Sequence, residues 1–156
     1  MAARITEARS DAEFACIREL FQEYAQSLGI DLEYQGFSNE LATLPGKYAP
    51  PTGALILAIV NGAAAGCVAL RALDSTTLEM KRLYVRPGTR GLGLGKQLVE
   101  AAISAARQRG YAELRLDTLA TMTPARALYG SLGFVEIAAY GDAHIPGTKF
   151  YALALS

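Results

Sequence analysis

The chain contains little of what metal and disulfide chemistry usually needs. It has two cysteines, one histidine and no tryptophan in 156 residues. Cys16 and Cys67 each stand alone in an apolar stretch, without the spacing of a metal site or a disulfide framework. We therefore expect no bound metal ion, two buried thiols in the reduced state, and a cytoplasmic location.

The chain also lacks net charge and long apolar runs. Fifteen basic residues balance fifteen acidic residues, so charge gives no reason to expect a nucleic acid or an anionic membrane as a partner. No apolar run approaches the ~20 residues of a membrane span, and the first residues lack the apolar core of a signal peptide. With 51% hydrophobic residues, residues 1–156 are expected to form a single domain.

Sequence periodicity predicts an α/β (α+β) fold. Ser10 and Glu13 form a capping-box pattern that opens a helix, and Gly29 closes it. Further helices are expected at residues 38–44, 94–109 and 123–131. Apolar or alternating runs predict strands at residues 3–8, 54–60, 66–72, 77–85, 113–119, 134–139 and 149–155. A helix crosses between strands 77–85 and 113–119, so these two strands are expected to be parallel.

Residues 90–95 read Arg-Gly-Leu-Gly-Leu-Gly and lie between a predicted strand and a predicted helix. Backbone N–H groups and the helix dipole at such a turn favour binding of a phosphate group. A Walker loop is excluded because Gln97 follows Lys96, where serine or threonine is required. A dinucleotide fingerprint is excluded because Lys96 and Leu98 take the place of its third glycine in the two registers.

A third pattern, Arg/Gln-x-x-Gly-x-Gly/Ala after a strand that ends in Val-x-Pro, fits Arg90, Gly93 and Gly95. Residues 125–134, Ala-Arg-Ala-Leu-Tyr-Gly-Ser-Leu-Gly-Phe, resemble a second pattern, Ala-x-x-Leu-Tyr-x-x-x-Gly-Phe. With both motifs, the chain resembles the GNAT superfamily of N-acetyltransferases, which use acetyl-CoA. Met122 departs from the pattern, because many relatives have at this position an asparagine that contacts the pantetheine arm.

The resemblance implies a GNAT-like fold with a mixed, mostly antiparallel sheet of about six or seven strands and about four helices. Its parallel strands, 77–85 and 113–119, would splay apart to admit the donor. The glycine turn would hold the pyrophosphate, and the strand edge would pair with the pantetheine arm and provide an oxyanion N–H near Leu83. The cofactor-binding residues implied are Leu83, Tyr84, Val85, Arg90, Gly91, Leu92, Gly93, Leu94, Gly95 and Lys96.

Tyr129 and Glu79 are the catalytic candidates that the resemblance implies. Tyr129 would lie beside the cofactor sulfur, where a phenol with a pKa of ~10 keeps its proton and can protonate the leaving thiolate. Glu79 occupies the position of a general-base glutamate. A salt bridge with Lys81 or Arg71 is the alternative explanation of Glu79, and a water relay is the alternative general base.

Three other polar residues have two explanations each. Asp117 either lines the cleft or is a surface carboxylate. His144 either borders the acceptor site or is solvated in its loop. Arg71 either meets a substrate carboxylate or forms an ion pair. The stretches implied to form the acceptor site, 24–37, 48–51 and 140–148, hold tyrosines and few acidic groups, which favours a small amine or amino-acid-like acceptor over a polybasic peptide.

An acetyl-CoA-dependent N-acetyltransferase acting on a primary amine of a small molecule is therefore the leading hypothesis. A non-catalytic acyl-CoA-binding regulatory module and a protein or peptide N-acetyltransferase are the alternatives. The last two strands, 134–139 and 149–155, are also a candidate surface for a homodimer, as in many relatives of the superfamily.

Overall fold

The computed structural model describes residues 3–29, 31–89, 91–141 and 145–155, apart from the side chain of Tyr34. Within them a single sheet of seven strands has the order β1-β2-β3-β4-β5-β7-β6. All neighbouring strands are antiparallel except β4 and β5, which confirms the predicted mixed sheet with one parallel pair. The strands are β1 (Ala3–Glu7), β2 (Ala54–Val60), β3 (Ala63–Ala72), β4 (Thr77–Val85), β5 (Glu113–Thr118), β6 (Val135–Ile137) and β7 (Lys149–Ala154).

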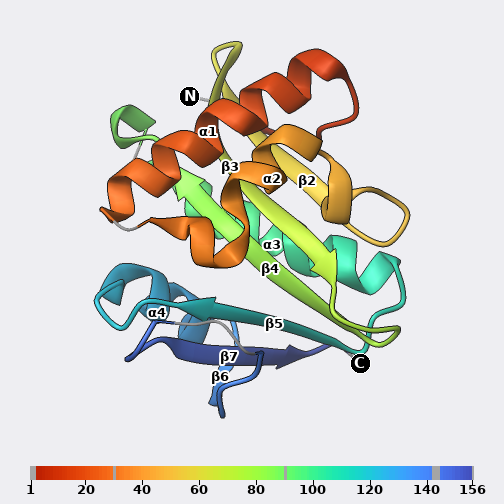
Figure 1. Ribbon diagram of the computed structural model, residues 1–156, viewed down its shortest axis with the longest axis vertical. Helices are drawn as coiled ribbons and strands as arrows, with labels where there is room; N and C mark the ends of the chain where they lie inside the picture. Colours follow the sequence, from red (N-terminus) through yellow and green to blue (C-terminus); the bar gives the residue numbers. More distant parts are fainter. Residues whose placement is uncertain (1–2, 30, 90, 142–144, 156) are drawn as a thin grey trace.

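Helices cover both faces of the sheet (Figure 1). In the described residues these are α1 (Asp11–Leu28), α2 (Phe37–Thr43), α3 (Leu94–Gln108) and α4 (Thr123–Ser131), with 3-10 turns η1 (Leu32–Gln35), η2 (Gly46–Tyr48) and η3 (Pro87–Thr89). One apolar core lies between the sheet and α3 and α4, and a second lies between the sheet and α1 and α2. The sheet is therefore the middle layer of three.

Helix α1 forms where its capping box predicts. The Ser10 hydroxyl accepts the N–H of Glu13 at 3.2 Å, and the Glu13 carboxylate accepts the N–H of Ser10 at 3.1 Å. Gly29 ends the helix in the left-handed region with φ of 63°. Such a cap is worth about 1 kcal/mol. It fixes the start of a helix whose fully buried face, Ile17 and Phe21 included, packs on the sheet.

The parallel pair β4 and β5 is joined over only part of its length. Pairing runs from Thr77 opposite Glu113 to Met80 opposite Leu116, and beyond these residues the two strands diverge (Figure 1). A register shift between β3 and β4 marks a bulge there, and Arg82 has a positive φ of 61°. Because a bulge bends its strand, the C-terminal half of β4 turns away from β5. The predicted splay is confirmed.

Several boundaries and one cysteine differ from the sequence prediction. Strand β3 begins three residues earlier than predicted, because a two-residue turn at Asn61 and Gly62, with φ of 52° and 78°, pairs Ala63 directly with Val60. Strand β5 ends at Thr118, and β6 keeps only three of the six predicted residues. Cys67 is buried as expected, but Cys16 is only half-buried on α1, so the expectation of two buried thiols was wrong for Cys16.

Candidate active site

The glycine turn that precedes α3 has the backbone of an anion site. Gly91 and Gly93 have φ values of 90° and 72°, which side chains with a Cβ rarely adopt. Gly93 is the N-cap of α3, and no side chain caps this helix end. The first N–H groups of α3 and the positive end of its dipole are therefore available to an anion. The side chain of Leu94 is buried, so Leu94 can contribute only its backbone, whereas Lys96 is exposed.

The side of β4 that faces away from β3 presents the second predicted contact. Arg86 N–H donates to the Ala65 carbonyl of β3 at 2.8 Å. Alternation along the strand therefore directs the N–H groups of Leu83 and Val85 away from β3, toward the gap beside β5. Tyr84 is different, because its buried side chain faces α1 and its hydroxyl donates to Glu23 at 3.3 Å. Of the three predicted strand residues, Leu83 and Val85 have the orientation that a paired pantetheine arm requires.

Tyr129, on α4, lies at the inner end of this gap. Its side chain is 5% exposed and packs against the rings of Phe134 and Tyr151, with ring centroids 5.8 and 6.0 Å away. It lines a cavity of about 50 Å³ together with Leu83 and Met122. Burial, with a smaller contribution from nearby charges, raises the pKa of Tyr129 above its ordinary value. The phenol therefore holds its proton at any physiological pH.

Glu79, on β4, is buried and fully engaged. Its Oε1 accepts Arg71 Nε at 2.9 Å and lies 3.8 Å from Lys81 Nζ, and its Oε2 accepts the Tyr140 hydroxyl at 2.7 Å. Burial alone would raise the pKa of Glu79, but Lys81, the Tyr140 hydrogen bond and Arg71 together hold it below the ordinary value. Both salt-bridge partners considered from the sequence are present, and Glu79 is an anion at neutral pH.

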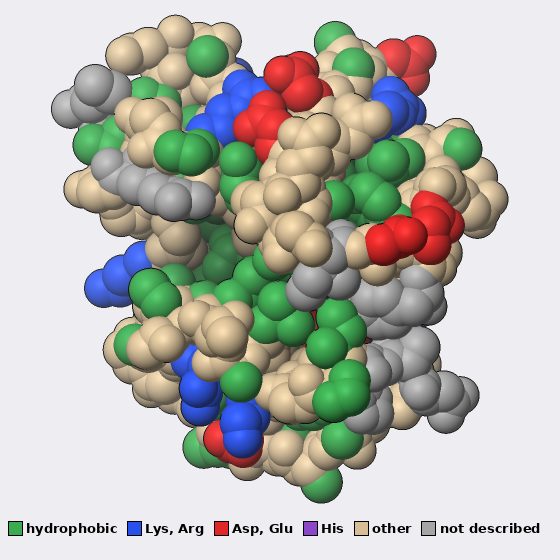
Figure 2. All heavy atoms as spheres, turned by 60° about the vertical axis from the view of Figure 1, so that its left-hand side comes forward, with side chains coloured by type: hydrophobic (Ala, Val, Ile, Leu, Met, Phe, Trp, Pro, Cys, Tyr) green, Lys and Arg blue, Asp and Glu red, His purple; other side chains and the backbone are tan. Residues whose placement is uncertain are grey.

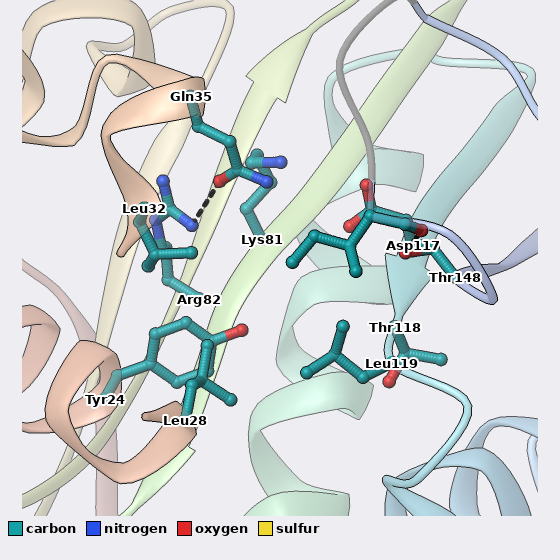
Figure 3. A pocket seen from close by; sticks show the side chains of 11 residues that line it. Tyr24, Leu28, Leu32, Gln35, Lys81, Arg82, Asp117, Thr118, Leu119 and Thr148 are labelled. Carbon is teal, nitrogen blue, oxygen red and sulfur yellow. Dashed lines mark hydrogen bonds between the residues drawn. The ribbon is translucent and has the colours of Figure 1, made fainter. Parts of the chain in front are cut away.

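Two of the cavities beside the diverging strands have lining residues in common. The cavity beside Tyr129 and a larger one of about 310 Å³ beside Glu79 share two lining residues, Lys81 and Asp117. Lys81 comes from β4 and Asp117 from β5, and Figure 3 shows them on opposite walls of the gap. Figure 2 shows the face toward which β4 and β5 run, hollowed across its middle and lined largely by hydrophobic side chains. The gap thus connects an apolar side with a charged side.

A buried ion pair holds the bulge of β4. Arg82 donates to both carboxylate oxygens of Glu40 on α2, through Nε at 2.9 Å and Nη2 at 3.0 Å. A further donor, Nη1, reaches Gln35 Oε1 at 2.7 Å, as Figure 3 shows. Arg82 and Glu40 are 4% and 6% exposed. Burial would raise the pKa of Glu40, but Arg82 and Lys47 hold it below the ordinary value.

Sequence reasoning missed Glu40 and Lys47, which this arrangement brings to the site, and it included Gln35 only as part of the stretch 24–37 implied for the acceptor. Gln35 and Lys47 line the larger cavity. All three come from the segment between α1 and β2, in which Glu40 lies on the short helix predicted at residues 38–44 and Lys47 lies in a proline- and glycine-containing stretch without periodicity. The available hint was Arg82 itself, one of three charged residues in the strand 77–85, because a charge that is buried there needs a partner. Two predicted residues, Arg90 and His144, lie outside the described residues.

Within the described ranges, no group of His, Cys, Asp and Glu side chains is arranged to hold a metal ion. None of the helices in the same ranges combines the length and apolarity that crossing a membrane requires.

A glycine turn at a helix N-terminus, next to two splayed parallel strands, is the arrangement expected of an acyltransferase that takes its acyl group from a coenzyme A thioester. The chain belongs to the acetyltransferase (GNAT) family, whose model matches residues 14–134. It is thus an N-acetyltransferase with acetyl-CoA as donor.

Individual relatives agree with this assignment. An uncharacterized N-acetyltransferase of Schizosaccharomyces pombe is 43% identical over 139 residues, 88% of this chain and 85% of that protein. The N-acetylaspartate synthetase of Danio rerio is 33% identical over 110 residues, 69% of this chain and 39% of that protein.

Solved structures share the fold. A GNAT-family acetyltransferase from Staphylococcus aureus superposes with a TM-score of 0.82 at 23% identity, covering 99% of this chain and 100% of the other. The yncA protein of Salmonella typhimurium, solved with acetyl-CoA, superposes with a TM-score of 0.71 at 22% identity, covering 100% of this chain and 95% of the other.

Proposed function

We propose that this N-acetyltransferase moves the acetyl group to the primary amine of a small molecule, by direct attack of the amine on the thioester in the gap between β4 and β5. One observation carries the proposal. The candidate acid Tyr129 and the candidate base Glu79 line two cavities that share Lys81 and Asp117. A thioester held in the gap would thus have an acid on the side of its sulfur and a base on the side of the amine.

The donor is proposed to bind from the hollowed, mainly apolar face. The N–H groups of Gly91, Gly93 and Lys96 would take the pyrophosphate, with the exposed Lys96 side chain adding charge. The pantetheine arm would pair with the edge at Leu83 and Val85 like an additional strand. Leu92, Gly95 and the backbone of Leu94 complete the turn, and Arg90 is proposed to belong to it from its motif alone.

The proton transfers of the reaction determine the roles of Glu79 and Tyr129. The ammonium form of the acceptor, with a pKa near ~10, first loses one proton to solvent. The neutral nitrogen then attacks the carbonyl carbon, and the N–H of Leu83 stabilises the oxyanion. As the C–N bond forms, the nitrogen becomes strongly acidic, so that even a carboxylate with a lowered pKa can take its second proton. That carboxylate is Glu79, and Tyr129 donates its proton to the thiolate as the C–S bond breaks.

The size of the acceptor cavity supports a small acceptor. Its volume of about 310 Å³ is at the lower end of small-molecule sites. Three basic side chains, Lys47, Arg71 and Lys81, line it against two acidic ones, Glu79 and Asp117, which disfavours a polybasic peptide. A relative whose name is that of an enzyme making N-acetylaspartate, an acetylated amino acid, points the same way.

A thiol-release assay with acetyl-CoA against free amines, amino acids and polybasic peptides tests the proposal. We expect amine-dependent release with small acceptors, rising about tenfold per pH unit below the pKa of the amine. Controls without acceptor measure hydrolysis. Binding of acetyl-CoA with no amine-dependent release from any acceptor would instead identify a non-catalytic acyl-CoA-binding module, and faster turnover of polybasic peptides would refute the acceptor class.

The same assay tests Glu79. Because glutamine keeps an oxygen for Arg71 but cannot accept the proton, we expect Glu79→Gln to lower kcat by about 100-fold. The melting temperature of the variant checks that it is folded. A kcat equal to that of the parent would remove Glu79 as the base and favour a water relay. The cytoplasmic location and the homodimer remain predictions.

A further inference from the structure

The cavity of about 310 Å³ beside Glu79, here called the acceptor cavity, has more positive than negative charge in its wall. Its charged residues and the buried pair behind them form a group made of two ion-pair networks, one around Glu79 and one around Glu40, together with Asp117. The group holds four cations and three carboxylates, namely Lys47, Arg71, Lys81, Arg82, Glu40, Glu79 and Asp117. The whole chain, by contrast, has no net charge. The excess is therefore a local feature of this cavity.

The carboxylates in the cavity wall do not occupy all the hydrogen-bond donors of its basic side chains. Glu79 is shared, since its Oε1 serves Arg71 at 2.9 Å and Lys81 at 3.8 Å while its Oε2 is taken by the Tyr140 hydroxyl. Arg71 reaches Glu79 through Nε alone, so its two terminal NH2 groups stay outside this ion pair. The Arg71 side chain is 34% exposed, which leaves those groups accessible from the cavity.

Lys47, on the turn η2, also shares its carboxylate with another cation. Its Nζ lies 3.3 Å from Glu40 Oε1, but that oxygen also accepts Arg82 Nη2 at 3.0 Å. Burial lowers the pKa of Lys47, and the positive charges of Arg71 and Lys81 lower it further against the opposing effect of Glu40. The three cations therefore repel one another across the cavity. Such repulsion is relieved when an anion enters.

We propose that the acceptor carries a carboxylate near its amine, and that Arg71 and Lys47 bind this carboxylate in the acceptor cavity. A guanidinium fork that presents its terminal NH2 groups matches the two oxygens of a carboxylate. Asp117 lines both this cavity and the one beside Tyr129, so it is the group that can hold the amine at the gap. The inference rests on the proposed function, and it narrows the acceptor to an amino acid.

Matched acceptor pairs test the inference. Each of the common L-amino acids, β-alanine and γ-aminobutyrate is compared with its carboxamide, which keeps the amine and removes the negative charge. We expect kcat/KM to be about 10- to 100-fold higher for the best acid than for its amide, since a hydrogen bond to a charged group is worth about that much. O-phosphoethanolamine, an amine with a different anion, is expected to be a poorer acceptor than this acid.

Variants locate the effect. Lys47→Gln is expected to lower the acid-to-amide ratio of kcat/KM by about tenfold, and Lys47→Arg to keep it. Lys149→Gln is the matched control, because Lys149 is 39% exposed and lies 3.7 Å from Glu136, while Lys47 is 37% exposed and lies 3.3 Å from Glu40. Lys149→Gln should leave the ratio and both rates unchanged.

The outcomes separate the two proposals. Amides used as well as acids, a preference for O-phosphoethanolamine, or an acid-to-amide ratio unaffected by Lys47→Gln would each overturn the carboxylate site while leaving acetyl transfer intact. Absence of amine-dependent thiol release from the acids, the amides and simple amines alike would contradict the proposed function itself.

Discussion

At the scale of single residues, the proposed chemistry is divided between two side chains that their surroundings push toward opposite protonation states. Burial raises the pKa of Tyr129, which keeps its proton, whereas cations and a hydroxyl lower that of Glu79, which keeps its charge. A pair of titratable groups whose environments separate their pKa values is typical of an acid and a base in one active site.

Tyr129→Phe distinguishes the role of the Tyr129 hydroxyl as a proton donor from the packing role of its ring. Phenylalanine keeps the contacts with the rings of Phe134 and Tyr151 and removes only the hydroxyl. We expect kcat to fall about 100-fold with little change in the KM for acetyl-CoA. Steady-state kinetics between about pH 6 and 9 measures this.

The neighbouring tyrosine provides the control for Tyr129. Tyr151 is 7% exposed, and its hydroxyl accepts Arg126 Nε at 3.1 Å. Tyr151→Phe makes the same chemical change in the same core but should leave kcat close to that of the parent. If Tyr129→Phe has no more effect than Tyr151→Phe across the pH range, Tyr129 is a packing residue and not the acid.

At the scale of secondary structure elements, the bulge in β4 is what opens the gap. Arg82 takes a positive φ there, and a non-glycine residue in this conformation is held by its surroundings. The surroundings are Glu40 and Gln35, which bind the guanidinium. Through these hydrogen bonds to Arg82, the helix α2 and the turn η1 on the acceptor side contact the strand β4, whose edge would bind the donor.

Glu40→Gln tests the contribution of the buried ion pair between Arg82 and Glu40. Removing one charge of a buried pair leaves Arg82 without a counter-charge, so we expect a loss of about 3–5 kcal/mol in the free energy of unfolding at pH 7. Because the folded-state pKa of Glu40 is lowered, its contribution is present above the unfolded pKa of ~4.3 and is lost as pH falls through the folded value. The difference between parent and variant should therefore shrink under acidic conditions. Urea unfolding of parent and variant, at pH 7 and under acidic conditions, measures this difference in the free energy of unfolding.

An exposed pair is the matched comparison for Glu40. Glu136, 53% exposed, lies 3.7 Å from Lys149, and Glu136→Gln should cost less than about 1 kcal/mol at either pH. Equal losses in the two variants, or a loss in Glu40→Gln that does not depend on pH, would contradict the stabilising role of the buried pair.

The elements could be predicted from local sequence where a short-range signal exists. The capping box of Ser10 and Glu13, the turn at Asn61 and Gly62, and the glycine turn before α3 are each encoded within a few residues. The bulge at Arg82 was not predictable, because it depends on Glu40, forty-two residues away in the chain. Of the candidate site, the motifs indicated Tyr129 and the turn, while Lys47 has no local pattern to mark it.

At the scale of the whole molecule, the donor and the acceptor are proposed to reach the gap between β4 and β5 from two different sides. The glycine turn and the open edge of β4 lie on the side of the hollowed face, and the charged acceptor cavity lies on the side of Glu79. Because the chain has no net charge, the local charge of the acceptor cavity is the main electrostatic influence on which acceptor binds. The donor is proposed to reach the thioester position along the edge of β4.

Amide chemical-shift mapping by NMR on the 156-residue chain tests that claim most directly. Two ligands are titrated, namely coenzyme A and its nucleotide half, 3′-phospho-ADP, which keeps the pyrophosphate and lacks the pantetheine arm. We predict that both shift the amides of residues 91–96, and that only coenzyme A also shifts Leu83, Val85 and Tyr129. Saturable binding of coenzyme A that leaves Leu83 and Val85 unshifted, or that shifts amides away from the gap instead, would contradict the account.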